Sequence, residues 1–330
     1  MRCIFLNERE TSLSKVYSDK LISELESFGF ENKTYTKSDI LSGDFSDVEY
    51  VFSTWGMPNF TKDEIKQNLP SLRAVFYAAG SVQAFAREFL ESGVKVFSAF
   101  AANAVPVAQY TFSQIILANK GFFTLTDKAF TRDKNKGRQV LSQYPGNFDT
   151  KVGIIGAGMI GSMVCRMLVR EGMDVMVYDP FLSDEKAEKL GVVKIDLETL
   201  FKDCFVISNH LANNEQTKGM LTGALFSKMQ TNAVFINTGR GAQVKEAELI
   251  SVLKSRPDLT AILDVTDPEP PLEDSGFYSL DNCILTPHIA GSSGFEVHRM
   301  SEYMKEEFLN FISDRKTKYE VTLSMLETMA

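Results

Sequence analysis

The chain has 330 residues, more than a single hydrophobic core usually serves, so two domains are expected. Its composition, with 44% hydrophobic and 24% charged residues, is that of a soluble globular protein. The net charge of −8, without any block of like charge, argues against nucleic-acid binding. An anionic substrate would therefore need a local positive site.

The first hundred residues alternate short apolar runs, typical of strands, with segments of helical spacing. The predicted strands are Arg2–Leu6, Val48–Ser53, Leu72–Ala78 and Val94–Ser98. The predicted helices lie within Leu13–Phe28, Ile65–Leu69 and Ala84–Leu90. This alternation implies βαβ units and a parallel sheet.

The uncharged stretch Val96–Asn119 is long enough to suggest a membrane span. It is interrupted by Asn103, Pro106, Gln109 and Gln114. We therefore interpret it as a buried strand followed by a buried helix, and we expect no membrane association. The N-terminal MRCIFLNERE becomes charged within a few residues, so it lacks the apolar core of a secretory signal.

A second α/β series begins near Lys151. Its predicted strands are Val152–Ile155, Asp174–Tyr178, Phe205–Asn209, Ala233–Asn237, Ala261–Val265 and Cys283–Thr286. Its predicted helices include Met159–Arg170, Lys245–Lys254 and Phe295–Ile312, and polar Thr131–Asp149 is expected to be a surface excursion. The sequence thus predicts an α/β protein with two doubly wound parallel-sheet domains.

The segment KVGIIGAGMIG, Lys151–Gly161, is a buried strand that leads through G-x-G-x-x-G into an apolar helix. Gly156 permits the tight turn, Gly158 lets the backbone approach a pyrophosphate, and Gly161 lets the helix pack closely on the strand. Amides at the helix start, around Met159 and Ile160, would hold the phosphates. The alternative is a glycine turn that binds no ligand.

The next strand, within DVMVYDP, ends at Asp179, where a carboxylate can accept both ribose hydroxyls of a dinucleotide. The same carboxylate would repel a 2′-phosphate, and no Arg or Lys follows until Lys186. NAD is therefore favoured over NADP as the cofactor.

The cysteines lie far apart without C-x-x-C spacing, and the chain has four of them beside three histidines. These counts argue against a metal site and favour a reducing, cytoplasmic location.

Three further motifs follow in order: INTGRG at Ile236–Gly241, LDVTDPEPP at Leu263–Pro271 and TPHIAG at Thr286–Gly291. With the glycine turn, they resemble the D-isomer-specific 2-hydroxyacid dehydrogenase family, in a little-defined branch with STWGMP-like and AAGSV-like loops. The resemblance covers nearly the whole chain. It implies a flavodoxin-like substrate domain, residues 1–102 and 292–330, that encloses an NAD-binding Rossmann domain, residues 103–291. It also implies a homodimer.

The resemblance assigns the chemistry to three residues. His288 would be the acid/base, because its ring exchanges protons near neutral pH. Glu269 would orient that ring and favour its protonated form. Arg240 would bind the substrate carboxylate through its planar, permanently charged guanidinium group.

The resemblance places further residues at the cofactor. Asp264 would fix the nicotinamide amide, and Thr238 and Gly239 would lie beside the cofactor. For His210, a structural hydrogen bond near the cofactor is favoured over direct contact, and His298 is expected to be a surface or packing residue. The family often has Arg inside the glycine turn where this chain has Met159, which predicts modest NAD affinity.

In the substrate domain, the loop Ala79, Gly80, Ser81 matches the family loop whose amides receive the substrate carboxylate. Trp55 is a candidate for lining the space of the substrate side chain, with ordinary cleft packing as the alternative.

Each catalytic assignment has a bland alternative. A lone His after Pro could cap a turn, and Arg240 and Glu269 could be solvated loop residues. Because all three follow strand ends, in order, an enzyme is favoured. The predicted function is hydride transfer between NAD and C2 of a small 2-oxo or D-2-hydroxy acid. The alternative is an NAD-sensing, corepressor-like binding protein on the same scaffold.

Overall fold

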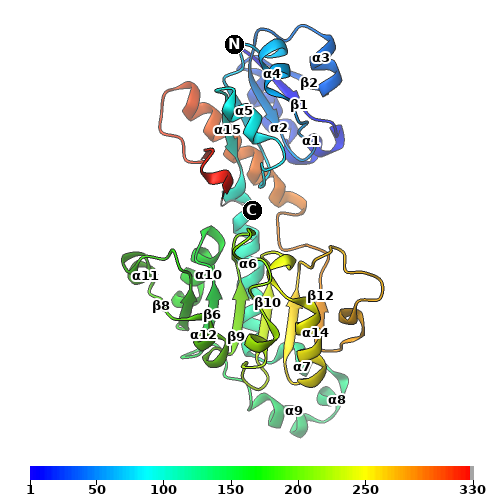
Figure 1. Cartoon of the computed structure of the whole chain (residues 1–330), viewed down its shortest axis with the longest axis vertical. Coiled ribbons are helices and arrows are strands. Elements are labelled where there is room, and N and C mark those ends of the chain that lie inside the picture. The colour runs from blue at the N-terminus through cyan, green and yellow to red at the C-terminus, as the bar shows by residue number, and fades with distance from the viewer. Residues whose placement is uncertain (328–330) are drawn as a thin grey trace. The chain divides into compact units, whose positions relative to one another are not determined.

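The computed structural model describes residues 1–327 and divides the chain into two compact units. Unit 1 comprises Met1–Ala104 and the described part of Ser292–Ala330, and unit 2 comprises Val105–Gly291. In Figure 1, unit 1 therefore carries the blue and the orange-to-red ends of the chain, and unit 2 the green and yellow middle. The first crossing lies within helix α6 (Phe100–Asn119).

Unit 1 contains a six-stranded sheet in the order β13-β5-β4-β3-β1-β2. Its strands are β1 (Arg2–Leu6), β2 (Phe30–Tyr35), β3 (Val48–Ser53), β4 (Ala74–Tyr77), β5 (Lys95–Ser98) and β13 (Glu320–Val321). Its helical segments are α1 (Glu10–Val16), α2 (Asp19–Glu26), α3 (Lys37–Ser42), α4 (Lys62–Asn68), α5 (Ala86–Glu91), α15 (His298–Ile312), η3 (Gly294–Val297) and η4 (Met325–Glu327). The first five strands pair in parallel in the flavodoxin-like order, and β13 adds to β5 in antiparallel.

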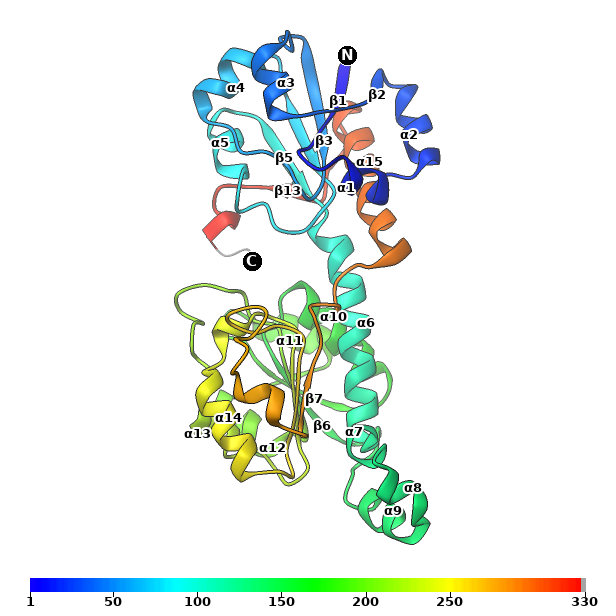
Figure 2. The ribbon, with the colours of Figure 1, turned by 90° about the vertical axis from the view of Figure 1, so that its right-hand side faces the viewer.

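The core of unit 1 contains residues from both of its chain segments, the N-terminal one and the C-terminal one. Phe308 of α15 packs edge-on against Phe52 of β3 and Phe76 of β4, with both ring centroids 5.5 Å away. Figure 2 shows α1, α2 and α15 on one face of this sheet and α3, α4 and α5 on the other. Apolar residues on both faces of the strands explain the two helical layers.

Unit 2 contains a seven-stranded sheet in the order β12-β11-β10-β9-β6-β7-β8. Its strands are β6 (Lys151–Ile155), β7 (Asp174–Tyr178), β8 (Val193–Lys194), β9 (Val206–Asn209), β10 (Val234–Asn237), β11 (Thr260–Leu263) and β12 (Cys283–Leu285). Beyond α6, its helical segments are α7 (Phe122–Leu125), α8 (Lys128–Arg132), α9 (Lys134–Leu141), α10 (Met159–Arg170), α11 (Asp184–Leu190), α12 (Leu197–Asp203), α13 (Gly223–Phe226), α14 (Glu246–Ser255), η1 (Gly241–Gln243) and η2 (Gly276–Ser279). Every pair is parallel, and the order reverses between β6 and β9. That reversal is where such sheets bind ligands at the carboxyl ends of their strands.

The two doubly wound sheets confirm the predicted fold class, but several details differ from the expected elements, among them the short strands β8 and β13, which were not predicted. The predicted helix within Leu13–Phe28 is broken into α1 and α2, with Ser18 capping α2. Strand β2 was not predicted, because its middle residues are polar and it lies at the sheet edge. The excursion Thr131–Asp149 includes α9 and the end of α8, and neither helix has a buried residue.

Helix α6 accounts for the long uncharged stretch of sequence. No helix in residues 1–327 is both long and apolar enough to cross a membrane. Ile115 and Ala118 of α6 are instead buried in the core of unit 2.

Candidate active site

The glycine turn joins β6 to α10 at the reversal of strand order, and each of its glycines meets a different constraint. Gly156 has φ +89°, and a Cβ there would lie 2.9 Å from the His210 carbonyl oxygen. A Cβ on Gly161 would lie 1.9 Å from the Gly156 carbonyl oxygen. A Cβ on Gly158 would meet no atom of residues 1–327 within 4 Å. Backbone atoms of the protein thus leave no room for a side chain at Gly156 and Gly161, whereas the space beside Gly158 is free. A dinucleotide pyrophosphate could approach the backbone through that space.

The two residues after Gly158 begin α10. Met159 is 41% exposed, whereas the side chain of Ile160 packs against the core of unit 2. The first amides of a helix have no intrahelical acceptor, so the backbone here, rather than these side chains, is suited to phosphate.

Asp179 lies directly after β7 and already contacts the glycine turn. Its Oδ2 accepts a hydrogen bond of 2.7 Å from the Ala157 amide, and its Oδ1 accepts one of 2.8 Å from the Phe181 amide. These bonds place an anionic carboxylate beside the turn, where ribose hydroxyls are recognised in this fold.

His210 follows β9 and is held by hydroxyl groups. Its Nε2 lies 3.0 Å from Ser208 Oγ, and its Nδ1 lies 3.4 Å from Thr238 Oγ1. Thr238 Oγ1 also lies 3.1 Å from Thr111 Oγ1 of α6. Burial lowers the pKa of His210 to about 3, so the ring is neutral near neutral pH. Both ring nitrogens therefore have partners within the protein, and the place of His210 near the cofactor stays a prediction.

The lowered pKa of His210 predicts a pH dependence of stability. Between about pH 6.5, where an unfolded His is protonated, and about pH 3, the unfolded state binds one more proton than the folded state. The free energy of unfolding should therefore fall as the pH falls through this range, by at most about 1.4 kcal/mol per pH unit from this group. Denaturant titrations between pH 7 and pH 4 should give a shallower decline for His210→Asn. Equal declines would contradict the prediction.

His288 and Glu269 form the central pair of the candidate site. His288 Nδ1 lies 2.7 Å from Glu269 Oε1, and their side chains are 47% and 41% exposed. Since a carboxylate only accepts, the proton between them belongs to His288 Nδ1, and Nε2 is left to exchange a proton with a ligand. The structure therefore brings together the two residues that the sequence paired.

The loop that carries His288 is held by Asp264, which is 2% exposed. One carboxylate oxygen accepts from Thr286 Oγ1 at 2.6 Å and from the Ile289 amide at 2.8 Å, and the other accepts from the Ala290 amide at 2.9 Å. The backbone of His288, with φ 54°, donates to the Asp264 carbonyl oxygen at 3.1 Å. Asp264 therefore shapes the loop that carries His288, and its contact with nicotinamide stays a prediction.

Arg240 follows β10 and is positioned by side chains that the sequence did not single out. Asn237 Nδ2 donates to the Arg240 carbonyl oxygen at 3.1 Å, and the Arg240 amide donates to Gln243 Oε1 at 3.2 Å. Asn209 Nδ2 bridges Asn237 Oδ1 and Gln243 Oε1 at 3.0 and 2.5 Å. These three amide side chains, which we call the amide cluster, are at most 1% exposed.

The amide cluster also accounts for Gly239. A Cβ at Gly239 would lie 2.9 Å from both Asn209 Nδ2 and Gln243 Oε1, so a larger residue would displace the cluster. The Arg240 guanidinium donates to the Gly239 carbonyl oxygen at 2.7 Å. No charge partner of Arg240 is recorded within residues 1–327, so its positive charge is available to an anion.

Strand order gives the spacing of the predicted catalytic groups. Arg240 and His288 follow β10 and β12, and Asp264 follows the strand between them. At about 4.8 Å per strand, the two strand ends are roughly 10 Å apart. A small acid could therefore contact a cation and a proton donor at the same edge of one sheet.

The other predicted substrate residues, Trp55 and the loop Ala79–Ser81, belong to unit 1 and follow its neighbouring strands β3 and β4. Trp55 is 41% exposed, and its carbonyl oxygen accepts from buried Asn7 at 3.2 Å. Ser98 Oγ donates to the carbonyl oxygens of Ala79 and Gly80, at 3.0 and 2.6 Å, and so fixes the loop. Ser81 is exposed. Trp55 and the Ala79–Ser81 loop thus lie on adjacent strand ends, and their contact with substrate stays a prediction.

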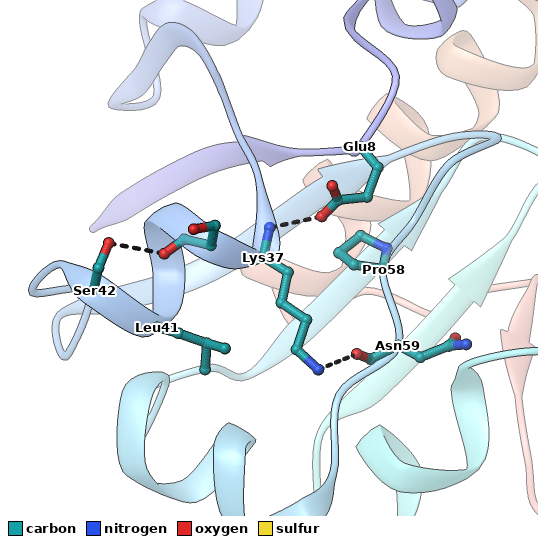
Figure 3. A pocket seen from close by; sticks show the side chains of 7 residues that line it. Glu8, Lys37, Leu41, Ser42, Pro58 and Asn59 are labelled. Atoms are coloured by element: carbon teal, nitrogen blue, oxygen red, sulfur yellow. Dashed lines mark hydrogen bonds between the residues drawn. The ribbon is translucent and has the colours of Figure 1, made fainter.

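Unit 1 also has an open pocket of about 620 Å³ that contains none of these residues. Figure 3 shows Lys37 at its centre, where the Lys37 amide donates to Glu8 and Nζ donates to the Asn59 carbonyl oxygen. Lys37 Nζ also pairs with Glu64 at 2.8 Å. Its charge is thereby neutralised, and the pocket offers no free cation for an acid substrate.

Comparisons with known proteins identify the family and the fold. Residues 113–290, more than half of the chain, match the family model described as D-isomer specific 2-hydroxyacid dehydrogenase, NAD binding domain. D-3-phosphoglycerate dehydrogenase of Archaeoglobus fulgidus is 29% identical over 72% of this chain and 44% of its own length. Hydroxypyruvate reductase of Thermotoga maritima is 29% identical over 66% of this chain and 70% of its own.

Among solved structures, D-mandelate dehydrogenase of Rhodotorula graminis superimposes with a TM-score of 0.78 at 20% identity, over 97% of each chain. That similarity shows the fold. The chain spans less than half the length of two curated relatives that it matches, with 44% and 42% covered. The matched NAD-binding domain, with its glycine turn and Asp179, shows that the chain belongs to the D-isomer specific 2-hydroxyacid dehydrogenase family.

Proposed function

We propose that the chain is an NAD-dependent oxidoreductase that transfers a hydride between nicotinamide and C2 of a small 2-oxo or D-2-hydroxy acid. The observation that carries the proposal is the 2.7 Å bond between His288 Nδ1 and Glu269 Oε1 in an NAD-binding domain. When the C2 carbonyl group of a 2-oxo acid accepts a hydride, its oxygen becomes an alkoxide. A proton donor of this kind is needed to protonate that oxygen.

The chain's own residues account for the remaining steps. Arg240 binds the substrate carboxylate, and its charge polarises the adjacent carbonyl. His288 holds a proton at Nε2 and donates it to the developing alkoxide, while Glu269 stabilises the protonated ring. NAD, when bound, supplies or accepts the hydride. In the direction of oxidation, His288 takes the hydroxyl proton instead.

The substrate class follows from the names of relatives. Besides the two named above, a relative from Korarchaeum cryptofilum, 27% identical, is named glyoxylate reductase. Each of these names describes an acid with a 2-oxo or 2-hydroxy group. No observation favours the NAD-sensing alternative. The homodimer and the cytoplasmic location stay predictions.

The test is NADH oxidation by the full-length protein with glyoxylate, hydroxypyruvate, pyruvate and phenylpyruvate as substrates. We expect turnover with at least one of them, at a rate well above that of NADH alone. NADH binding without turnover on a wider panel of 2-oxo acids would contradict the enzyme and favour a binding protein.

Asp179 should determine the choice of cofactor. Asp179→Ala removes the carboxylate that would repel a 2′-phosphate, so we expect the affinity ratio of NADH to NADPH to fall by roughly tenfold. Asp174→Ala, at the other end of β7, is the matched control and should leave the ratio unchanged. Titration of both variants with each reduced cofactor measures the ratio. An unchanged ratio in Asp179→Ala would mean that another group sets it.

A further inference from the structure

The glycine turn of unit 2 lacks a cation. Its six residues, Gly156–Gly161, are all uncharged, and its exposed side chain is that of Met159. Backbone amides and the helix dipole favour a phosphate there, but they supply only fractional charge. A dinucleotide carries two negative charges on its pyrophosphate, so a nearby cation would add to its affinity.

One ammonium group does reach the turn, from helix α11. Lys186 Nζ donates to the Ala157 carbonyl oxygen at 2.9 Å. The Ala157 amide, in turn, donates to Asp179 Oδ2 at 2.7 Å. Lys186 therefore binds the carbonyl group of Ala157, and Asp179, the predicted ribose-binding residue, binds its amide group. This places the ammonium group at the edge of the cofactor site.

The charge of Lys186 is not neutralised by its neighbours. Of the acidic residues of α11, Asp184 pairs with Lys194 at 2.8 Å and Glu185 with Lys189 at 3.4 Å, and Glu188 forms no ion pair with Lys186. Within residues 1–327, Lys186 Nζ hydrogen-bonds to the Ala157 carbonyl oxygen, which is a neutral acceptor, and forms no ion pair. An exposed ammonium with a neutral partner remains able to bind an anion.

Helix stability does not explain a lysine at this position. Ser183 caps α11 by accepting from the Lys186 amide, so Lys186 is the third residue of the helix. In α3 and α4 the equivalent position holds Asp39 and Glu64, whose carboxylates complete a capping box. A cation in the first turn instead opposes the helix dipole, at a cost of about 0.3–1 kcal/mol. A local preference that is overridden next to a binding site points to function.

We propose that Lys186 is a phosphate-binding residue of the cofactor site, and that it supplies from α11 the cation that the glycine turn lacks. The proposal rests on the proposed use of NAD. The long side chain of Lys186 can exchange the Ala157 carbonyl oxygen for a phosphate oxygen without moving the helix. Its ligand is then a dinucleotide phosphate group, either the pyrophosphate or the 2′-phosphate of NADPH.

The experiment compares Lys186→Gln with Lys189→Gln in the full-length protein. Glutamine removes the charge but keeps an N–H donor for Ala157, so it separates electrostatics from the hydrogen bond that holds the turn. Lys189 is on the same helix, 78% exposed and away from the turn, which makes it the matched control. Calorimetric titrations with NADH, NADPH, ADP-ribose and adenosine, each at low and high salt, report binding without reference to turnover.

We expect Lys186→Gln to weaken NADH and ADP-ribose binding about tenfold at low salt, as for loss of one charged hydrogen bond. It should also reduce the salt dependence of binding and leave adenosine affinity unchanged. Lys186→Arg should retain the affinity, and Lys189→Gln should not change it. An equal loss for NADH and NADPH would assign the contact to the pyrophosphate, and a larger loss for NADPH would assign it to the 2′-phosphate.

Two results would overturn the proposal. Unchanged NADH and NADPH affinities in Lys186→Gln would show that no phosphate contacts this group. An adenosine affinity that falls as much as the NADH affinity would show that Lys186 only holds Ala157 in place. All of these measurements are binding constants, so they do not depend on turnover. If the protein binds NADH but reduces no 2-oxo acid, the proposed function is contradicted, but the test still decides the role of Lys186.

Discussion

Replacing His288 with Gln should lower the turnover number by a factor of roughly 10² to 10⁴, the range that general acid–base catalysis contributes. Glutamine can still hydrogen-bond to Glu269, but it cannot deliver a proton to an alkoxide. NADH binding should persist, because the glycine turn and Asp179 follow other strands of the sheet. Steady-state rates with the best 2-oxo acid, together with NADH titrations, measure both quantities.

The backbone at His288 calls for a second variant. Its φ of 54° is left-handed, a conformation that Asn adopts more readily than Gln. His288→Asn should therefore lose turnover without strain in the loop, and it should melt at the same temperature as the unchanged protein. His298→Gln, in α15, is the control for loss of a histidine as such. If His288→Asn retained full turnover, the acid/base role would be removed from this residue.

The second large effect concerns a pair of glycines in one turn. Gly161→Ala would place a Cβ 1.9 Å from the Gly156 carbonyl oxygen, and a backbone atom cannot yield as a flexible side chain can. We expect the free energy of unfolding to fall by about 3 kcal/mol or more, with loss of NADH binding because the turn is displaced. Denaturant unfolding without cofactor and NADH titration provide the two measurements.

Gly158→Ala should lower NADH affinity without lowering the stability of the fold. Its Cβ would meet nothing within 4 Å in the described part of the chain, so the free energy of unfolding should change little. The added methyl group would nevertheless occupy the space through which the backbone approaches a pyrophosphate, and NADH affinity should fall by roughly tenfold or more. A stable Gly158→Ala protein with unaltered NADH affinity would place the pyrophosphate elsewhere.

Strands with unbroken apolar runs were predictable from sequence, and edge elements were not. β6 and β10 are buried on both faces, so continuous apolar residues reveal them. β2 reads FENKTY, and only its two end residues are buried, because it is the edge strand of its sheet. The break between α1 and α2 was missed because both helices present apolar residues to the same core, so the helical spacing continues through it.

The candidate site shows the same division. His288 and Glu269 were paired from their motifs, and the structure brings them within hydrogen-bond distance. The amide cluster was missed because Asn and Gln occur equally in loops, and because Asn209 of β9 is distant in sequence from Asn237 of β10 and Gln243 of η1. No local pattern marks such residues. Only the parallel register of β9 and β10, which sets Asn209 opposite Asn237, brings them together.

The two crossings of the chain have a consequence for synthesis on the ribosome. Unit 2 is one uninterrupted segment, so it can fold as soon as its last strand has emerged. Unit 1 cannot complete its fold at that point, because Phe308, which packs on the rings of Phe52 and Phe76, is translated after the whole of unit 2. During that interval the apolar face of an incomplete sheet is uncovered. The nascent chain is therefore expected to depend on chaperones for its first domain rather than for its second.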